Sequence, residues 1–316
     1  MCNYTISPQM RSGRCCVTIL SMDGAFFDDL IDELYGTSIF VNSVSPVYGG
    51  DINESFAMEL SDGKTMFIKT NRAGALDMFK AEERGLSAIR ETHAISAPEV
   101  VCSGISGDRS YLMMSYISGA SGRKDFWESF AHSLADMHKA DASSFVPSGK
   151  FGFEIDNYIG SGEQYNTPEG SWIRFFTEHR LKPQFARAKR FFNPIDLEKI
   201  DRLMERVPHL LVEPEAPALI HGDLWSGNYV TGDDGYAWLI DPAVYVGHPE
   251  ADIAMTELFG GYDRRFYEAY RESGLLMSGY EDRRDIYNLY HMLNHLNLFG
   301  SGYYGAVMRI VNRYVG

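Results

Sequence analysis

The chain has 316 residues, of which 45% are hydrophobic and 23% charged, and its formal net charge is −14. This balance is typical of a globular protein, and the acidic charge argues against a nucleic-acid-binding surface, which needs clustered Lys and Arg. No apolar run reaches the ~20 residues of a transmembrane helix, so we expect neither a nucleic-acid partner nor a membrane partner.

The N-terminal segment lacks the basic region, long apolar core and small-residue cleavage site of a secretory signal. We expect residues 1–20 to form an extension to which no function is assigned. The four cysteines are Cys2, Cys15, Cys16 and Cys102. Their spacing fits neither a disulfide framework nor a zinc site, and reduced thiols in a cytoplasmic protein are the simplest interpretation.

Short β-rich runs interrupted by Gly and Asp occupy the next part of the chain. The runs "SIFVNSVSPVYGG", "ESFAMEL" and "KTMFIKT" predict a meander of antiparallel strands. The segment "ALDMFKAEERGLSAIRE" follows, with Leu76, Phe79, Leu86 and Ile89 on one face of a helix. The runs "APEVVCSG" and "RSYLMMSYIS" predict two further strands. Together these elements predict a small β-rich lobe over residues 21–117.

After about residue 118 the pattern becomes helical. In "DFWESFAHSLADMHKA", Phe126, Phe130, Leu134 and Met137 recur at helical intervals, and "PIDLEKIDRLMERVPHLL" repeats this pattern. We therefore predict an α+β fold with two lobes, a small antiparallel-sheet N-lobe and a larger, mainly helical C-lobe over residues 118–316. A cleft between two lobes is where a ligand is expected to bind.

The stretch "LIHGDLWSGNYV" places a histidine, an aspartate and an asparagine between two apolar ends. Asp223 and Asn228 share a tight loop, and Asp241 follows the strand-like run "YAWLI". A hairpin between "LIHGD" and "WLIDP" would bring the three oxygen-bearing side chains together. The spacing matches a kinase catalytic loop, in which one Asp accepts a proton while Asn and a second Asp hold Mg²⁺. The alternative is a polar turn, with His221 satisfied by the backbone and Asp241 capping a helix.

Two features upstream favour the kinase interpretation. Lys69 lies in the apolar run "MFIKT", where an ammonium is costly unless paired, and Glu82 follows thirteen residues later in the predicted helix. A Lys on the third strand paired with a Glu on the next helix positions ATP phosphates in kinase folds. The loop "VYGGDINES", with Gly50 and Asn53, could present backbone N–H groups to phosphates. The alternatives are a surface Lys with a solvated Glu, and an ordinary hairpin turn.

Several segments together closely resemble the fructosamine kinase (ketosamine-3-kinase) family, relatives of the aminoglycoside phosphotransferases. They include "HGDLWSGN", "LIDPAVYVGHPEADIAMTELFGG" and "LNHLNLFGSGY", and the similarity runs from about residue 38 to residue 312. The resemblance implies a protein-kinase-like fold and the use of ATP and Mg²⁺. It also implies phosphorylation of the O3 hydroxyl of ketoamines, the ribulosamine or fructosamine adducts of lysine or protein amines. The phosphorylated product sheds its sugar, so the implied role is deglycation.

The resemblance assigns roles by motif. Asp223 is implied as the catalytic base, Asn228 and Asp241 as the metal ligands, and Lys69 with Glu82 as the phosphate-positioning pair. These assignments depend on the match of each residue to the family pattern.

The run "LMMSYI" resembles the hinge of kinase folds. The Ser115 carbonyl and the Ile117 amide are expected to meet adenine, and Met114 to lie behind the base. The ring of Trp225 is expected to cover one face of a sugar, and His295 to belong to a substrate wall together with Asn297.

Structural alternatives stay open at three of these positions. Trp225 could simply pack between the lobes. Helical spacing turns Leu293, Leu296 and Phe299 to the core, which leaves His295 off that face and makes a structural role for it a close alternative. For Glu250 and Asp252 we favour structural roles at the start of a helix.

Two other functions compete with ketoamine phosphorylation. One is another small-molecule kinase of the same fold, with an aminoglycoside, choline or homoserine as acceptor. The other is a kinase-like binding protein without catalysis, which the presence of Lys69, Asp223, Asn228 and Asp241 disfavours. The expected partner is a small-molecule or protein-bound ketoamine.

Overall fold

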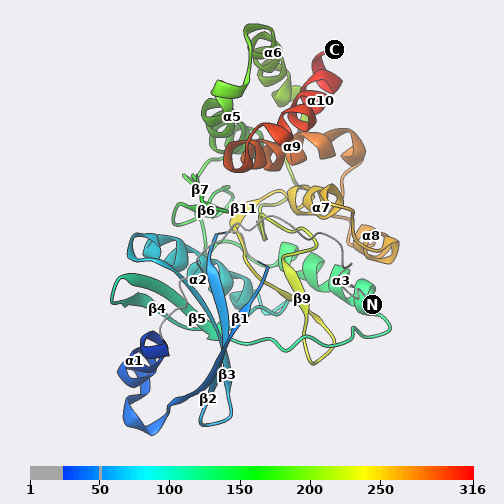
Figure 1. Cartoon of the computed structure of the whole chain (residues 1–316). Coiled ribbons are helices and arrows are strands. Elements are labelled where there is room, and N and C mark those ends of the chain that lie inside the picture. The colour runs from blue at the N-terminus through cyan, green and yellow to red at the C-terminus, as the bar shows by residue number, and fades with distance from the viewer. Residues whose placement is uncertain (1–23, 50–51) are drawn as a thin grey trace, which may run out of the picture.

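The computed structural model describes residues 24–49 and 52–316. Within these residues an N-lobe built on one five-stranded sheet lies at one end of the molecule, and a mainly helical C-lobe lies at the other (Figure 1). The predicted α+β arrangement is confirmed. The expected N-terminal extension of residues 1–20 lies outside the described residues, as do Cys2, Cys15, Cys16 and Gly50, while Cys102 is a free thiol.

The N-lobe sheet is antiparallel throughout, with strand order β1-β2-β3-β5-β4. Its first three strands form the predicted meander, and the turn "SDG" connects the second to the third. The bounds are β1 Val41–Val47, β2 Glu54–Leu60, β3 Thr65–Arg72, β4 Val100–Ser106 and β5 Arg109–Ser115.

Two helices cover the two faces of this sheet. Helix α1 (Gly24–Tyr35), which the sequence analysis did not predict, buries Phe27, Leu30 and Ile31 in one small core together with Met66 and Ile68 of β3. Successive side chains of a strand point to opposite faces, so Phe67 and Lys69 lie on the other face.

That other face is covered by α2 (Leu76–Glu91). Phe79, Leu86 and Ile89 of this helix are buried in the main core, as predicted, and Leu76 is partly buried. Phe67 packs against the same core. The alternation along β3 therefore directs Lys69 toward α2 and the C-lobe.

The C-lobe consists of helices and short strand pairs. Both helices predicted from periodicity are confirmed, and the second begins with a capping box formed by Asn193 and Asp196. The helices are α3 Phe126–Lys139, α4 Trp172–Phe175, α5 Lys182–Ala188, α6 Pro194–Leu210, α7 Pro249–Leu258, α8 Arg264–Arg271, α9 Tyr280–Phe299 and α10 Tyr304–Val315. The strands are β6 Asn157–Ile159, β7 Gly162–Gln164, β8 Ala218–Ile220, β9 Tyr229–Thr231, β10 Ala237–Leu239 and β11 Tyr245–Gly247.

The segment between β5 and α3 contains no regular element before a turn at residues 124–125. We propose that the boundary between the N-lobe and the C-lobe lies in this segment, near residue 117.

The centre of the C-lobe is aromatic. Trp172 is fully buried, and its ring stacks on Tyr245 of β11 with ring centroids 6.4 Å apart and on Phe175 at 5.9 Å. The Tyr287 ring of α9 lies 6.1 Å away on the same indole. These rings join α4, α9 and β11 into one core, which supports the polar segments at its edge.

The expected hairpin between "LIHGD" and "WLIDP" is wrong in its pairing. Strand β8 pairs with β11, and β10 pairs with β9. The loop after β8 leads directly into the β9–β10 hairpin, so the chain reverses direction twice before β11 pairs with β8. A second expectation was that Phe299 faces the core, but its side chain is 50% exposed because α9 ends at this residue.

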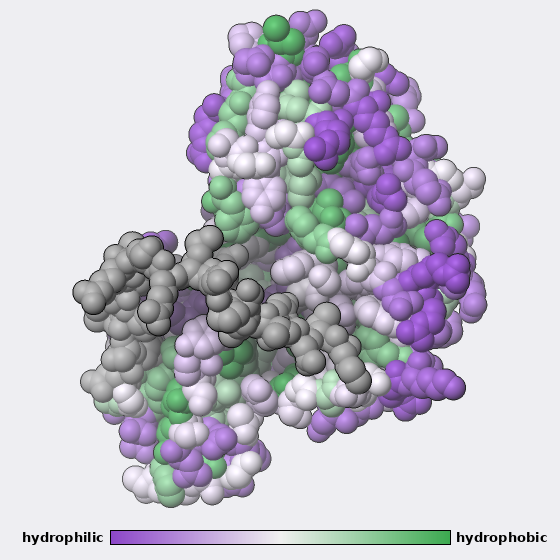
Figure 2. Space-filling view, turned by 45° about the vertical axis from the view of Figure 1, so that its right-hand side comes forward, coloured by the Kyte–Doolittle hydropathy of each residue, from purple (hydrophilic) through white to green (hydrophobic). Residues whose placement is uncertain are grey.

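The surface seen in Figure 2 is mainly hydrophilic over the helical lobe, and the hydrophobic residues form small separate groups. Scattered apolar residues of this kind are normal on a protein surface. Within the described part of the chain, none of the helices has the length and apolar character that crossing a membrane requires.

The N-cap of α7 generates a prediction about stability and pH. His248 is fully buried, and its Nδ1 accepts a hydrogen bond from the Glu250 amide at 3.1 Å. Burial, together with Arg283, lowers the pKa of His248 to about 3. The unfolded chain takes up this proton near pH ~6.5, so the native state loses stability as pH falls from about 6.5 toward 3.

The parent protein should therefore lose unfolding free energy between pH 7.5 and pH 5. We expect this loss to be smaller by about 2 kcal/mol in His248→Asn, in which the asparagine can still cap the helix. Urea unfolding at both pH values measures this difference. The cavity left by the smaller side chain lowers the unfolding free energy equally at both pH values, so it does not affect the comparison. The control is His209→Asn at an exposed position of α6. An unchanged pH dependence in His248→Asn would contradict the assignment.

Candidate active site

Three charged residues from both lobes meet at the centre of the molecule. Lys69 of β3 donates to Glu82 of α2, with Nζ and Oε1 2.6 Å apart, and also to Asp241 of the C-lobe. The Lys69 and Glu82 side chains are 8% and 14% exposed. Burial lowers the pKa of Lys69, but the attraction of Asp241 and Glu82 outweighs burial and holds that pKa above its ordinary value. The predicted Lys–Glu pair is therefore formed.

The buried carboxylate of Asp252 holds the loop that follows β8. Asp252 of α7 accepts hydrogen bonds from the backbone amides of His221 at 2.7 Å and Gly222 at 2.8 Å. His138 contacts the same carboxylate, with Nε2 and Oδ2 3.2 Å apart. Asp252 thus has a structural role, as favoured, and it supports the loop before Asp223. Glu250 is structural as well, because it pairs with Arg283 at 2.5 Å in a buried position.

Two residues give this loop its shape. His221 donates from Nε2 to the Ile240 carbonyl at 3.0 Å and accepts at Nδ1 from the Asp223 amide at 3.2 Å, so the backbone satisfies both ring nitrogens. Gly222 has φ +81°, and a Cβ atom there would lie 2.1 Å from the Ala243 carbonyl oxygen. Only glycine permits this approach of the two backbone segments.

Asp223 and Asn228 face each other across the loop. Asn228 Nδ2 donates to the Asp223 carbonyl at 2.7 Å and to Asp223 Oδ2 at 3.2 Å. Burial raises the pKa of Asp223 to about 7, and the Asp241 and Asp252 carboxylates add to this effect against the Asn228 hydrogen bond. The Asn228 amide nitrogen is turned to Asp223, which directs its oxygen elsewhere.

Asp241 reaches the same region from the other side of the loop. It is one of two non-glycine residues with positive φ in the described part of the chain, at +55°, a conformation that is uncommon and recurs at functional sites. The Ile240 amide donates to the Asn228 carbonyl at 3.1 Å, which ties the two segments together. The loop, and not the predicted hairpin, thus brings Asp223 and Asn228 into contact and places Asp241 close enough to affect the Asp223 carboxylate. Asp241 precedes no helix that it caps.

The donor set at this point suits a hard cation. Asn228 offers an amide oxygen, and the Asp241 carboxylate is 46% exposed, so a cation can reach it. Oxygen ligands of this kind fit Mg²⁺, which keeps several waters and takes phosphate oxygens as further ligands. Within the described residues there is no group of three or more His, Cys, Asp and Glu that could hold a metal.

The residues predicted to hold the nucleotide lie beside this cluster. Met114 is buried on β5 opposite Phe67 of β3, and Ser115 is the last residue of that strand, with Ile117 two positions beyond. Asn53 accepts a hydrogen bond at Oδ1 from Asn71 of β3 at 2.8 Å. Gly50 lies outside the described residues.

On the C-lobe side, exposed aromatic rings lie next to the loop. Trp225 is 38% exposed, and its ring meets Phe259 edge-on at 6.1 Å. The His295 ring lies 5.1 Å from Phe259. His295 donates from Nδ1 to the His291 carbonyl at 2.8 Å, so a neutral His295 leaves Nε2 as an acceptor. Asn297 points elsewhere, with Nδ2 donating to Gln184.

Sequence reasoning missed two residues of this region. Phe259 connects Trp225 to His295 but follows the end of α7, where no periodic pattern singles it out. His291 of α9 is 4% exposed, and its Nδ1 lies 3.7 Å from Asp223 Oδ1. It precedes His295 by one helical turn, which was the available signal, because positions four apart share a helix face.

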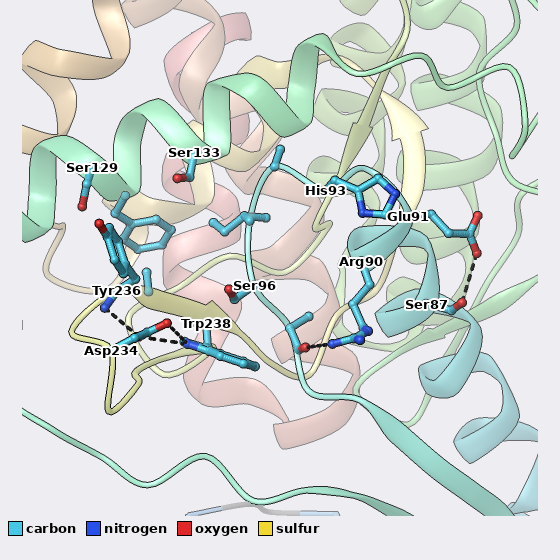
Figure 3. A pocket seen from close by; sticks show the side chains of 15 residues that line it. Ser87, Arg90, Glu91, His93, Ser96, Ser129, Ser133, Asp234, Tyr236 and Trp238 are labelled. Atoms are coloured by element: carbon cyan, nitrogen blue, oxygen red, sulfur yellow. Dashed lines mark hydrogen bonds between the residues drawn. The ribbon is translucent and has the colours of Figure 1, made fainter.

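A cavity of about 670 Å³ lies at another junction of the lobes, lined from α2, α3 and β10 (Figure 3). Arg90, Tyr236 and Trp238 belong to its wall, and none of the predicted site residues does. Nearby, the Leu239 amide donates to the Ser96 carbonyl at 2.8 Å and joins the lobes. The cavity is therefore separate from the Lys69–Asp223 region.

The fold and the arrangement of the site define a phosphotransferase of the protein-kinase-like type. The family model for fructosamine kinase matches residues 26–316, and the chain belongs to this family. A candidate ketoamine kinase of Synechocystis sp. is 40% identical over 280 residues, which cover 86% of this chain and 90% of the relative.

Two further relatives agree with this membership. A chloroplastic protein-ribulosamine 3-kinase of Oryza sativa subsp. indica is 37% identical, covering 98% of this chain and 90% of the relative. The solved structure of a candidate fructosamine-3-kinase from Haemophilus somnus has a TM-score of 0.81 at 28% identity, covering 92% and 97% of the two chains.

The contact between α2 and the segment after Asp241 generates a prediction. Gly85 lies one turn after Glu82, and a Cβ atom there would lie 2.5 Å from Val244 Cγ2. We expect Gly85→Val to displace α2 from this segment, to move Glu82 relative to Lys69, and to lower kcat/KM for ATP by roughly 10-fold or more. Steady-state kinetics of the purified variant measures the effect.

The matched control is Gly305→Val on α10, where an added Cβ atom meets nothing within 4 Å. Both substitutions replace a helical glycine with valine, so they change intrinsic helix propensity in the same direction. Thermal unfolding of both variants separates a displaced helix from a general loss of folding. A Gly85→Val protein with the kcat/KM of the parent would show that the close approach of α2 is not needed.

Proposed function

We propose that the chain transfers the γ-phosphoryl group of ATP to the O3 hydroxyl of a ketoamine, a ribulosamine or fructosamine adduct of lysine or of a protein amine. The observation that carries the proposal is the position of Asp223. Its carboxylate is 21% exposed, lies beside Asn228 and follows the fully buried His221, and Trp225 stands two residues further on. This arrangement occurs in a member of the fructosamine kinase family.

On the nucleotide side, Lys69 has the assigned task of positioning the α- and β-phosphates, with Glu82 holding its ammonium in place. The Ser115 carbonyl and the Ile117 amide meet adenine, Met114 lies behind it, and Gly50 and Asn53 belong to the loop over the phosphates. Each of these assignments is part of the proposal.

Mg²⁺ is held by Asn228 and Asp241 in this proposal. When bound, it neutralises charge on the phosphate oxygens. The Lys69 ammonium donates to Glu82 and to Asp241, which is a proposed cation ligand. In this proposal the ammonium therefore lies between the cation ligands and the nucleotide phosphates.

The chemical step is a direct in-line transfer. The acceptor hydroxyl oxygen bonds to the γ-phosphorus, the bond from this phosphorus to the β,γ-bridging oxygen breaks, and ADP leaves with that electron pair. The hydroxyl proton passes to the Asp223 carboxylate. Most of the rate comes from positioning and charge stabilisation, as phosphoryl transfer generally requires.

On the acceptor side, the Trp225 ring covers one face of the sugar, and His295 Nε2 accepts a hydrogen bond from the substrate. The net charge of −14 favours the approach of cationic amines and lysine-rich segments. The relatives at 37–40% identity are named for ketoamine or ribulosamine phosphorylation, which favours this acceptor class over an aminoglycoside, choline or homoserine. A cytoplasmic location stays a prediction.

An acceptor panel tests the proposal directly. ATP consumption is measured with Mg²⁺ and, in parallel, ribulosyl-lysine, fructosyl-lysine, choline or kanamycin. We expect turnover with the two ketoamines only, because the relatives at 37–40% identity are named for this acceptor class. Turnover confined to choline or kanamycin would overturn the substrate assignment while leaving the phosphotransferase fold in place.

The role of Asp223 has its own test. We expect Asp223→Asn to lower kcat by roughly 100-fold or more, because the amide cannot accept the hydroxyl proton, while Mg·ATP still binds. The control is Asp108→Asn, at an exposed turn between β4 and β5. Calorimetric titration with Mg·ATP and the ketoamine assay give the two readouts. Near-normal turnover by Asp223→Asn would refute the assignment of the base.

A further inference from the structure

His291 is a buried histidine whose ring faces the proposed catalytic base. Its side chain is 5% exposed, and Nδ1 lies 3.7 Å from Asp223 Oδ1. This Nδ1 is fully buried and has no hydrogen-bond partner within the described residues. Leaving a buried polar atom unpaired typically costs about 1–3 kcal/mol, so its position requires an explanation.

The placement of His291 follows from the geometry of α9. His291 and His295 are one turn apart on the same side of the helix. His295 reaches the exposed aromatic rings near Trp225, whereas His291 lies deeper, edge-on to the Tyr290 ring with centroids 5.2 Å apart. The helix thus presents one histidine to the acceptor side and one to the carboxylate of Asp223.

His291 is neutral at physiological pH. Burial lowers its pKa to about 3, with His295 and Arg180 acting in the same direction and Asp252 against it. A neutral imidazole carries one N–H group. Because Nδ1 faces a carboxylate oxygen, the tautomer with the proton on Nδ1 is favoured over one that sets two lone pairs against each other.

We propose that His291 is a positioning residue, whose Nδ1–H donates to Asp223 Oδ1 and fixes the plane of the carboxylate. Asn228 Nδ2 lies 3.2 Å from the other oxygen, Oδ2, so two donors from α9 and from the loop hold the two oxygens of one group. A side-chain movement of about 0.5 Å brings the His291 pair within hydrogen-bond distance. Each carboxylate oxygen keeps a lone pair for the acceptor hydroxyl.

This inference rests on the proposed function, in which Asp223 accepts the hydroxyl proton. A carboxylate with a fixed plane stays aimed at that proton, and misplacing a reacting group by an ångström can cost about 100-fold in rate. In this inference His291 acts through Asp223, so we expect its loss to affect kcat and to leave the KM for ATP largely unchanged.

Two variants separate the hydrogen bond from packing. His291→Asn can place an amide N–H where Nδ1–H was, and His291→Leu fills a similar volume without a donor. We expect His291→Leu to lower kcat by roughly 10- to 100-fold, with the KM values for ATP and ketoamine within about 3-fold of the parent. His291→Asn should recover most of the lost kcat. His132→Leu, at an exposed position of α3, is the control.

Other kinetic outcomes overturn the inference. Equal losses in both His291 variants would indicate packing alone, and a raised KM for the ketoamine at unchanged kcat would place His291 on the substrate instead. A double mutant adds a third check. In the Asp223→Asn background, His291→Leu should lower the residual kcat by less than about 3-fold, because the group it positions has been replaced. A full additional loss would contradict action through Asp223.

A measurement that needs no acceptor keeps the inference distinct from the proposed function. Nitrogen-15 NMR of the labelled parent protein at pH 7.5 identifies the tautomer of His291, assigned by comparison with His291→Asn. We expect the proton on Nδ1, and a proton on Nε2 alone would overturn the inference. If no ketoamine is turned over while this Nδ1–H tautomer is observed, the proposed function fails and the positioning contact stands.

Discussion

The buried ammonium of Lys69 is the constraint on which the rest of the site depends. A lysine on a strand interior is tolerated only if its charge is paired, and here one partner comes from α2 and the other from the C-lobe. Glu82 fixes the helix against the sheet, and Asp241 fixes the C-lobe loop against both. The two ion pairs that compensate for the burial of this ammonium therefore hold the two lobes in a fixed relative position. The same contact places the proposed cation ligands beside the proposed phosphate site.

A second buried charge, that of Asp252, stabilises the loop that carries Asp223. Asp252 uses its carboxylate to satisfy two backbone amides that have no helix or strand to pair with. Its other contact, His138, is itself hydrogen-bonded to the Tyr270 hydroxyl at 2.6 Å. The loop is irregular in backbone conformation, yet each of its turns is held by a specific donor or acceptor. Rigid support of this kind is what phosphoryl transfer requires of its polar groups.

Much of this arrangement could be predicted from the sequence, and the remainder could not for physical reasons. Periodicity located the strands around Lys69 and the helices α2, α3 and α6, because each shows an apolar face to one core. Helix α1 was missed although Phe27, Leu30 and Ile31 lie three and four residues apart, the same apolar spacing that located α2. The pairing of β8 with β11 was missed because three-residue strands carry almost no pattern. His291 was missed because its burial beside Asp223 depends on packing across the lobe, and its spacing from His295 indicates only a shared helix face.

The two proposed substrates meet Asp223 from different parts of the chain. In the proposal, the nucleotide side consists of residues on β3, α2 and β5, and the acceptor side consists of residues in the loop after Asp223, at the end of α7 and on α9. Trp225, Phe259 and His295 form a continuous row of rings on the acceptor side. In this proposal acceptor specificity can change through Trp225, Phe259 and His295, whereas Asp252 of α7 and His291 of α9 cannot change without affecting Asp223, which serves both sides.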